Sequence, residues 1–578
     1  MRIMKTTHQS LIFPLNVYAE LLELAFGQVD FLSYGLQAEP GLSIVEAQQA
    51  MTTKLLAMLE HGPGSSVLDV GCGTGMLAQQ LMASGYQVTA IDANEAAIAA
   101  ARQRFASEAP LALAELQAFE PDQRFDVLIL QNSARYQSPL TVFAHARRLL
   151  KAGGQLLIQE EFTGDDAERV AEPLPVLTHV VQMAGRAGFE LTQQHDVSVG
   201  VGDWLQRCLP LLEQHMVALT ERTGLSTQML SDLRQSMSAD LSRCRSGRYV
   251  HALLSFRMEG TDVTLLPAEA LPIEQFRSLF ENSFDTDFSA ELWHWKYGQG
   301  RGHSVVACKQ GEAVAHYGGI SRDILYFGAP EQALQICDVM VLPQHRSFYS
   351  RSSLFFLTAA TMLELHAGNT RRHLLGFGFP NLKAMHVAQR LKLYAKTDEL
   401  MALSFPPGCF DTNTGDDAWT VASGSPDTGD WKRVDVLWQQ MALAFTDGIV
   451  GLRNAHYLFY RYVQRPGLDY QFHVIRHTSG EKAVAVTRDH GEGLLIMDII
   501  TADKNMAAAL QALCRHGHDI GRPMIFWLSA GQQQRFQATG LQADATGIHI
   551  PCNAWTQGPS AEKLQGKWWL TAGDMDFL

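Results

Sequence analysis

The chain has 578 residues, too many for one hydrophobic core, and at about 150 residues per domain this length predicts three or four domains. Hydrophobic residues make up 46% and charged residues 18%, which is ordinary for a globular protein, and no apolar run is long enough to cross a bilayer. The first residues lack the charged-then-apolar pattern of a secretion signal, so we expect a cytoplasmic protein without a membrane partner. The formal charge of −14 argues against a nucleic-acid partner, because such partners need clustered basic side chains.

The eight cysteines are scattered along the chain and form no Cys-x-x-Cys pair. This pattern predicts neither a zinc site nor a disulfide framework. We therefore expect reduced thiols and no bound metal. The cysteines are Cys72, Cys208, Cys244, Cys308, Cys337, Cys409, Cys514 and Cys552.

Two helices are predicted before the first strand. Residues 18–26 carry apolar side chains at helical spacing, and a second helix begins after Ser43, a natural N-cap residue. This spacing indicates that both helices pack against the core.

The most informative stretch is an apolar strand, residues 67–70, that runs into a glycine turn. The glycines stand at alternate positions: Gly71, Gly73 and Gly75. Such glycines let the backbone pass close to a ligand, and they open a predicted helix over residues 76–83 whose first N–H groups face that ligand. The next apolar strand, residues 87–91, ends in Asp92, which is placed to accept hydrogen bonds from ribose hydroxyls. The sequence therefore predicts a nucleoside ligand.

The spacing of the turn decides between two nucleoside cofactors. A dinucleotide fingerprint would put Met76 at its third glycine, so an NAD-dependent oxidoreductase is disfavoured. The turn closely resembles motif I of class I S-adenosyl-L-methionine (SAM)-dependent methyltransferases, and residues 124–130 and 149–158 resemble the fourth and fifth strands of that family. The resemblance implies an α/β fold, a Rossmann-like domain with SAM as its cofactor. The cofactor contacts that it implies are Asp69, Gly71, Gly73, Gly75, Asp92, Leu116 and Gln131.

The resemblance also implies a small-molecule substrate. Residues 31–35 and the following helix are similar to the N-terminal lid of the tocopherol and cyclopropane-lipid methyltransferases, where Tyr34 would border the methyl group. The fourth strand does not end in the Glu-Ser-His pattern of the tocopherol group, so the resemblance assigns no catalytic residue. The candidates for handling a proton are Tyr136, Glu160 and Glu161. Residues 180–191 and 249–254 resemble the family's closing elements, so residues 1–258 are predicted to form one domain.

The second half of the sequence contains a repeat. An aromatic segment, a strand, a glycine turn, another strand and an Asp-containing strand occur twice in the same order, with Asp338 and Asp498 in corresponding places. We predict two copies of one α/β domain joined by a polar, glycine-rich linker. The predicted ranges are 259–410 for the first copy, 411–432 for the linker and 433–578 for the second copy.

The two copies resemble tandem GNAT (Gcn5-related N-acetyltransferase) domains. The resemblance implies that residues 338–346 and the helix 354–365 hold the pyrophosphate of acetyl-CoA or another acyl-CoA. The acyl-CoA contacts that it implies are Val341, Arg346 and Asn381, and Arg351 is a further candidate because its side chain could itself hold a phosphate.

The first copy departs from the GNAT pattern in two places. Tyr349 and Arg351 stand where the family has glycines, and Ala388 stands where it often has a general-acid tyrosine, although Tyr394 could supply a hydroxyl. The second copy has no arginine turn after Asp498, so we interpret it as a structural copy.

Two functions remain open at this point. The first is a bifunctional small-molecule tailoring enzyme that combines SAM-dependent methyl transfer with acyl-CoA-dependent N-acylation. The second is a methyltransferase whose C-terminal half is a non-catalytic module that binds the substrate or docks a carrier protein. Methylation at nitrogen, oxygen or carbon is compatible with the sequence.

Overall fold

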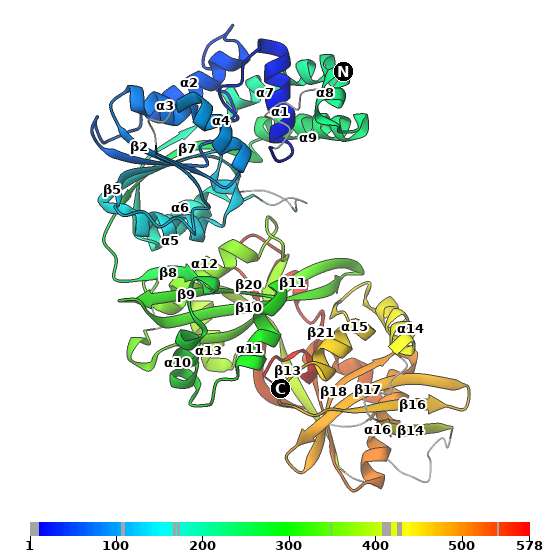
Figure 1. The fold of residues 1–578 in the computed structure, drawn as a ribbon. Helices are drawn as coiled ribbons and strands as arrows, with labels where there is room; N and C mark the ends of the chain where they lie inside the picture. Colours follow the sequence, from blue (N-terminus) through cyan, green and yellow to red (C-terminus); the bar gives the residue numbers. More distant parts are fainter. Residues whose placement is uncertain are drawn as a thin grey trace. The chain divides into compact units, whose positions relative to one another are not determined.

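The computed structural model describes residues 11–105, 110–165, 169, 174–347, 350–406, 418–424, 431–539 and 543–577 (Figure 1). The chain divides into two compact units, Met1–Leu266 and Pro267–Leu578. None of the described helices is both long and apolar enough to cross a membrane.

The first unit is built on a seven-stranded sheet in the order β3-β2-β1-β4-β5-β7-β6. All neighbouring pairs are parallel except those of β7, which is antiparallel to β5 and β6. The strand order reverses between β1 and β4, and such reversals are where doubly wound sheets bind ligands. The strands are β1 (Ser66–Val70), β2 (Gln87–Asp92), β3 (Leu111–Leu113), β4 (Phe125–Gln131), β5 (Leu150–Thr163), β6 (Phe189–Asp196) and β7 (Tyr249–Met258).

Helices cover both faces of this sheet (Figure 1). They are α1 (Leu15–Phe26), α2 (Ile44–Leu56), α3 (Met76–Ala83), α4 (Glu95–Phe105), α5 (Pro139–Leu149), α6 (Leu177–Arg186), α7 (Ser198–Gln214), α8 (Met216–Thr223) and α9 (Thr227–Arg245), with the 3₁₀ turn η2 (Ala134–Tyr136). Because both faces are covered, all five residues of β1 are buried. The Ser43 hydroxyl accepts from the Glu46 N–H and the Glu46 carboxylate accepts from the Ser43 N–H, so the predicted cap of α2 is confirmed as a capping box.

The second unit contains two seven-stranded sheets. The first has the order β12-β11-β10-β15-β21, with β9 also on β10 and β8 on β9; the second has the order β14-β16-β17-β18-β19-β13-β20. The strands are β8 (Thr264–Pro267), which spans the division between the units, β9 (Gly302–Lys309), β10 (Glu312–Tyr326), β11 (Ala329–Val341), β12 (Leu375–Phe377), β13 (Tyr394–Phe405), β14 (Trp419–Gly424), β15 (Ile449–Gly451), β16 (Gln471–His477), β17 (Gly480–His490), β18 (Gly493–Thr501), β19 (Met524–Ser529), β20 (Ala543–Asn553) and β21 (Trp568–Trp569).

The helices of the second unit pack on these sheets. They are α10 (Ile273–Phe284), α11 (Ala290–Tyr297), α12 (Leu354–His366), α13 (Leu382–Arg390), α14 (Trp431–Ala442), α15 (Ala455–Leu458), α16 (Met506–Asp519) and α17 (Ala561–Leu564). One π-helical turn, Phe459–Val463, follows α15. Short 3₁₀ turns are η3 (Ala268–Ala270), η4 (Gly298–Gly300), η5 (Pro343–His345), η8 (Leu443–Phe445), η10 (Asp503–Asn505), η11 (Ala530–Thr539) and η12 (Ala572–Asp574).

The two sheets exchange strands between the predicted copies. Strand β13, from the first predicted copy, pairs with β19 and β20 of the second sheet. Strands β15 and β21, from the second predicted copy, extend the first sheet beside β10. Within the predicted linker 411–432, residues 411–417 and 425–430 lie outside the described residues, and Trp419–Gly424 form β14 rather than a connector. The ranges of the two copies therefore stay a prediction.

The repeat itself appears in matched contacts. The Tyr297 hydroxyl donates to the Asp338 carboxylate at 2.8 Å, and the Tyr462 hydroxyl donates to the Asp498 carboxylate at 3.0 Å. In each copy, a tyrosine at the end of a short helix or in the turn after it thus binds an aspartate on a long strand. This correspondence supports the repeat that the sequence pattern predicts.

Candidate active site

The glycine turn after β1 is fixed to the end of β2. All three of its glycines have positive φ angles, of 75°, 54° and 80° in chain order, in the left-handed region that favours glycine: Gly71, Gly73 and Gly75. The Gly73 N–H donates to Asp92 Oδ2 at 3.0 Å, and the Asn94 N–H donates to Oδ1 at 2.8 Å. Each carboxylate oxygen of Asp92 keeps a free lone pair, so it can still accept from a ligand hydroxyl.

The surroundings of the three glycines differ. A Cβ on Gly71 would lie 2.5 Å from Ser133 Cβ, and a Cβ on Gly75 would lie 2.5 Å from the Phe105 ring, so both positions are closed by packing. A Cβ on Gly73 would meet nothing nearer than a Leu32 methyl group at 3.9 Å. The open side of the turn is therefore at Gly73, next to the carboxylate of Asp92.

Asp69, in β1 just before the turn, is a buried carboxylate. Its side chain is 1% exposed, and its Oδ2 atom has no hydrogen-bond partner among the described residues. Burial, together with the nearby Asp92 charge, raises the pKa of Asp69 to about 7. A buried polar atom without a partner costs free energy, so this oxygen fits a site where a bound ligand supplies the donor.

The other two predicted cofactor contacts are placed differently. Leu116 is buried after β3, as expected for an apolar contact. Gln131 ends β4, and its amide nitrogen donates to Thr52 Oγ1 at 2.9 Å and to Gln159 Oε1 at 3.0 Å. Its role toward a cofactor stays a prediction, because these bonds already use the donor group of its side chain.

Glu160 is held by Arg135, a residue for which the sequence analysis predicted no role. Arg135 donates from Nε at 2.9 Å and from Nη2 at 2.6 Å to Glu160 Oε1, and its backbone N–H donates to Oε2 at 3.0 Å. The Glu161 N–H adds a further bond to Oε1 at 3.0 Å. Both oxygens of Glu160 therefore already accept hydrogen bonds from the chain itself.

Glu161 lies in a different environment. It stands directly opposite His251 in the antiparallel pairing of β5 with β7, and its Oε1 lies 3.6 Å from His251 Nε2. Both atoms are buried without a partner within hydrogen-bond distance. Burial raises the pKa of Glu161 to about 7, against the opposing charge of Arg135. Burial and the Arg135 charge lower the pKa of His251 to about 3, so the imidazole is neutral.

Aromatic side chains complete this cluster. The Tyr34 ring lies 4.8 Å from the His251 ring and 5.9 Å from the Trp204 ring, between ring centroids, and the Arg135 guanidinium lies 5.7 Å from its centre. The Tyr34 N–H donates to Asn132 Oδ1 at 3.3 Å, which ties the predicted lid to the end of β4. Tyr34 thus lies beside the buried pair of Glu161 and His251, and its place next to the methyl group of the cofactor stays a prediction.

Of the three predicted proton-handling residues, the geometry favours one. Tyr136 is 59% exposed, and partial burial with the charges of Glu160 and Asp92 raises its pKa. Glu160 is saturated by Arg135, whereas Glu161 has an unpartnered oxygen. The sequence missed Arg135 and His251; the only available signal was a histidine inside an otherwise apolar closing strand.

In the second unit, two of the predicted acyl-CoA residues, Val341 and Arg346, lie at the end of β11. The Arg346 guanidinium donates to the Val341 carbonyl at 2.9 Å and to the Ser283 carbonyl at 3.2 Å, so it braces the turn. Arg351 lies over the Trp555 ring, 5.3 Å from its centre. Asn381 caps α13 by accepting from the Ala384 N–H at 2.9 Å. These acyl-CoA roles stay predictions.

The structure describes one of the two tyrosines that the sequence analysis considered for this region. Tyr349 lies outside the described residues. The Tyr394 hydroxyl is buried and accepts from the Tyr317 hydroxyl at 2.9 Å. Ala388 is buried in α13.

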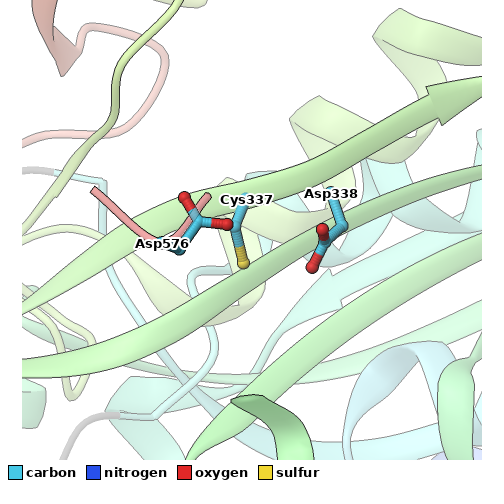
Figure 2. Close-up of side chains that lie close together, drawn as sticks. All are labelled: Cys337, Asp338 and Asp576. Atoms are coloured by element: carbon cyan, nitrogen blue, oxygen red, sulfur yellow. The ribbon is translucent and has the colours of Figure 1, made fainter. Parts of the chain in front are cut away.

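Three possible metal ligands converge beside β11. Figure 2 shows Cys337 and Asp338 on this strand close to Asp576. The Lys296 ammonium lies 2.9 Å from Asp338 Oδ1 and 2.7 Å from Asp576 Oδ2. Burial alone would lower the pKa of Lys296, but the two carboxylates raise it, so the group stays charged. Lys296 therefore supplies the positive charge that this cluster requires.

Comparison with known proteins supports the family resemblance predicted for each half of the chain. Residues 67–154 match the family model described as a methyltransferase domain, and residues 267–368 match the one described as an acetyltransferase (GNAT) domain. The chain joins a methyltransferase domain to a GNAT domain. The GNAT match covers only the first of the two predicted copies.

Curated relatives match the methyltransferase half. The chain is 34% identical over 130 residues to the ubiquinone biosynthesis O-methyltransferase of Pseudomonas paraeruginosa (strain DSM 24068 / PA7), covering 20% of this chain and 56% of that protein. It is 32% identical over 146 residues to the malonyl-[acyl-carrier protein] O-methyltransferase of Erwinia pyrifoliae, covering 25% of this chain and 52% of that protein. The chain thus spans about half the length of these relatives.

Solved structures are similar to each half. One is the cyclopropane synthase MmaA2 from Mycobacterium tuberculosis, with 16% identity, a TM-score of 0.38, and coverage of 44% of this chain and 96% of that one. Another is a conserved protein from Enterococcus faecalis V583 described as a probable N-acyltransferase, with 12% identity, a TM-score of 0.40, and coverage of 50% and 72%.

Proposed function

We propose that the first unit is a SAM-dependent O-methyltransferase of a small molecule. The observation that carries this proposal is the open glycine turn at Gly73 with the Asp92 carboxylate locked beside it, in a segment that matches a methyltransferase domain. The curated relatives are both named as O-methyltransferases, which favours an oxygen acceptor over nitrogen or carbon.

The residues at the turn fit SAM. The carboxylate of Asp92 would accept from the ribose hydroxyls, and the unpartnered Asp69 oxygen would accept a donor from the cofactor or from a water beside it. The left-handed glycines leave the backbone at Gly73 exposed toward the ligand. When bound, SAM supplies an electrophilic methyl group on a positively charged sulfur.

The chain's contribution to methyl transfer is proton handling and positioning. An acceptor hydroxyl must lose its proton as its oxygen forms the new bond, and Glu161 is the group with an unused, buried carboxylate oxygen. With a pKa of about 7, Glu161 is ionised in part at neutral pH and holds the proton well once it is taken. The neutral His251 ring lies opposite Glu161, with its Nε2 atom 3.6 Å from the same Oε1 atom.

Arg135 and Tyr34 position this base. Arg135 binds Glu160 Oε1 through two side-chain nitrogens, and its Nη2 atom also lies 3.5 Å from Glu161 Oε2, so Glu161 Oε1 is the oxygen left to exchange a proton. The packing of Tyr34 on His251 excludes water from the pair and raises the strength of its electrostatic interactions.

For the second unit we propose an acyl-CoA-dependent N-acyltransferase site in the first sheet, at the end of β11. The match of residues 267–368 to a GNAT domain supports it, as does the arginine-braced turn before α12. The alternative is a non-catalytic module that binds the substrate or docks a carrier protein for the methyltransferase unit.

One experiment tests the methyltransferase proposal. The chain is incubated with SAM and a panel of phenols, carboxylic acids and amines, and S-adenosylhomocysteine is measured by mass spectrometry. We expect turnover with a subset of the oxygen acceptors. Turnover with amines alone would contradict the O-methyl assignment, and failure of SAM to bind would contradict the function as a whole.

A further inference from the structure

Two buried polar atoms of the first unit lie close together without bonding to each other. Glu161 Oε1 on β5 and His251 Nε2 on β7 are 3.6 Å apart, beyond hydrogen-bond distance, and neither atom has a partner among the described residues. The Glu161 side chain is 5% exposed and that of His251 is 3% exposed. Buried polar atoms without partners are rare in folded proteins, so each of these two atoms requires an explanation.

The fold sets the spacing of the two side chains. Glu161 and His251 are directly opposite each other in the antiparallel pairing of β5 with β7. Arg135 Nη2 lies 3.5 Å from the other carboxylate oxygen, Glu161 Oε2. The His251 backbone N–H donates to Ser198 Oγ at 3.0 Å. The strand register and these contacts therefore determine where the two unpartnered atoms lie.

The two atoms are complementary in hydrogen bonding. A glutamate oxygen accepts hydrogen bonds, and an imidazole nitrogen that carries a proton donates them. The Glu161 carboxylate favours the tautomer of His251 with its proton on Nε2, because an N–H is attracted to a negative oxygen and a lone pair is repelled. Burial and the Arg135 charge lower the pKa of His251 to about 3, so the neutral ring carries one proton. The pair thus offers one acceptor and one donor side by side.

A hydroxyl group matches this pair. Its O–H donates to the glutamate while its oxygen accepts from the histidine, and an oxygen about 2.8 Å from both atoms makes two ordinary hydrogen bonds. The separation of 3.6 Å suits such an oxygen, which completes a triangle with the two atoms. An ammonium group only donates and an ether oxygen only accepts, so each leaves one atom of the pair unsatisfied.

The charges around the pair disfavour a carboxylic acid as the methyl acceptor. Arg135 is one cation beside two acidic side chains, and its Nε and Nη2 atoms already donate to Glu160. Burial raises the pKa of Glu161 to about 7 against the charge of Arg135, and the charges of Asp240 and Glu160 raise it further. A substrate carboxylate placed against Glu161 would add another negative charge in this buried site, which is costly.

Aromatic rings lie beside the pair. The Tyr34 ring is 4.8 Å from the His251 ring and 5.9 Å from the Trp204 ring, between ring centroids. A planar acceptor can pack against such rings while its hydroxyl reaches the pair. Because both polar atoms are buried, a ligand reaches them only when a neighbouring side chain moves. These surroundings fit an aromatic hydroxyl compound.

We propose that Glu161 Oε1 and His251 Nε2 together bind the acceptor hydroxyl, and that the substrate is an aromatic hydroxyl compound such as a phenol. His251 is then a specificity-determining residue, because its N–H holds the acceptor oxygen while Glu161 takes the proton. The O–H bond breaks, its proton goes to Glu161, and an electron pair of the oxygen forms the bond to the methyl carbon. The carbon–sulfur bond breaks with its electrons left on sulfur, which gives S-adenosylhomocysteine. This inference rests on the proposed function, because it assigns the acceptor of the same methyl transfer.

A series of naphthalenes tests the proposal by binding, without turnover. The four probes share one ring system and differ in one substituent: 2-naphthol, 2-methoxynaphthalene, 2-naphthoic acid and 2-naphthylmethylamine. Their fluorescence is followed during titration with the full chain at neutral pH, with and without S-adenosylhomocysteine. We expect 2-naphthol to bind about 10-fold more tightly than each of the others, because only its hydroxyl satisfies both atoms of the pair without adding charge.

Variants at position 251 separate the role of the N–H from that of the ring. His251→Phe removes the donor and should weaken 2-naphthol binding about 10-fold, the effect of losing one hydrogen bond in a buried site. His251→Gln keeps a donor nitrogen and should retain most of the affinity. His195→Phe, at an exposed position of β6, is the matched control and should leave the affinity unchanged.

The outcomes separate this inference from the proposed function. Tighter binding of 2-naphthoic acid than of 2-naphthol would overturn the inference, and so would unchanged 2-naphthol affinity in His251→Phe or no binding of any probe. A preference for 2-naphthol that depends on His251, in a chain that does not bind SAM, would support the hydroxyl site while contradicting the methyltransferase proposal. SAM binding with turnover of carboxylic acids alone would support that proposal and overturn the hydroxyl site. If His251→Phe does not fold, the four affinities of the wild type still decide the question.

Discussion

The buried carboxylates of the two units differ in how they are satisfied. In the first unit, Asp69 Oδ2 and Glu161 Oε1 have no hydrogen-bond partner among the described residues. In the second unit, Asp338, Asp498 and Asp574 each accept bonds from a buried lysine or arginine. An unpaired buried oxygen is a cost to folding, so its presence marks a place where a ligand completes the contact.

The comparison separates groups that serve chemistry from groups that hold the fold. A carboxylate already paired with a cation gains nothing from a ligand, and losing its partner leaves an uncompensated charge in the interior. A carboxylate without a partner has a raised pKa and can exchange a proton near neutral pH. Substitutions in the two units should therefore have opposite signatures in stability and in activity.

The largest expected effect is on stability in the second unit. Arg453→Met leaves Asp498 and Asp574 buried without their shared cation, which should destabilise this unit by about 3–5 kcal/mol. The measurement is the free energy of its unfolding transition in the full chain, followed by calorimetry or hydrogen exchange. The control Lys396→Met removes an exposed pair with Glu399 and should cost about 0–1 kcal/mol. An equal loss of unfolding free energy in the two variants would contradict the claim that the buried ion pairs hold the fold of the second unit.

The next effect has the opposite sign and lies in the first unit. The pKa of Glu161 is about 7 in the folded chain, and an unfolded glutamate titrates near about 4.3. The folded state therefore binds this proton more tightly, and stability is lost as pH rises from the unfolded pKa through 7. Glu161→Gln should stabilise the first unit at pH 8 by on the order of 2–3 kcal/mol and should have little effect near pH 4.

Glu160→Gln is the matched control for this prediction. Its carboxylate is bound to Arg135, so removing the charge should destabilise the first unit at pH 8 rather than stabilise it. Denaturant unfolding of both variants at pH 4 and pH 8 gives the comparison. Destabilisation by Glu161→Gln at pH 8 would show that the Glu161 oxygen has a partner after all.

A third effect concerns cofactor affinity. Asp92→Asn keeps an acceptor for the Gly73 N–H but removes the charge that favours ribose hydroxyls, and it should weaken SAM binding by about 1.5–3 kcal/mol. Isothermal titration measures the change. Adding Gln131→Glu to the Asp92 variant should not restore SAM affinity, because the side chain at position 131 contacts Thr52 and Gln159. Unchanged affinity of the Asp92 variant would remove this residue from the cofactor site.

The smallest effect is expected at the end of β11 in the second unit. Arg346 is exposed and already braces the Val341 carbonyl, so Arg346→Ala should weaken acetyl-CoA binding by about 1 kcal/mol, the scale of a solvent-screened contact. SAM affinity should not change. Equilibrium dialysis with both ligands is the measurement, and a weaker SAM affinity in this variant would contradict the assignment of the two ligands to separate units.

The sequence predicted the parts of the site that are local in the chain. The glycine turn and Asp92 belong to one strand-turn-helix-strand unit, so spacing alone placed them together. Glu161 and His251 face each other only because β7 enters the sheet antiparallel beside β5, a pairing across 90 residues that no local pattern specifies. Arg135 was missed for the same reason, since its partner Glu160 lies on another strand.

In the second unit, the repeat was visible in the sequence but the sheet pairing was not. The matched Tyr–Asp contacts follow from the repeated segments. The transfer of β13 to the second sheet and the bridge between Leu528 and Thr571 depend on long-range pairing, and the sequence contains no charge or turn signal for either. Asp574 and Asp576 form ion pairs with Arg453 and Lys296, which lie far away in the chain, so the sequence alone assigned them no role.

The pH dependence of methyl transfer tests the central claim most directly. With an oxygen acceptor found in the panel, the turnover rate of the wild type should rise with pH through about 7, because Glu161 must lose its proton to act as the base. Glu161→Gln should abolish this rise of the rate with pH and lower the rate by about 10²–10⁴-fold. Glu160→Gln should still show a rate that rises with pH. A Glu161→Gln variant with the rate and the pH profile of the wild type would contradict the claim that the buried carboxylate with the unpartnered Oε1 atom performs the chemistry.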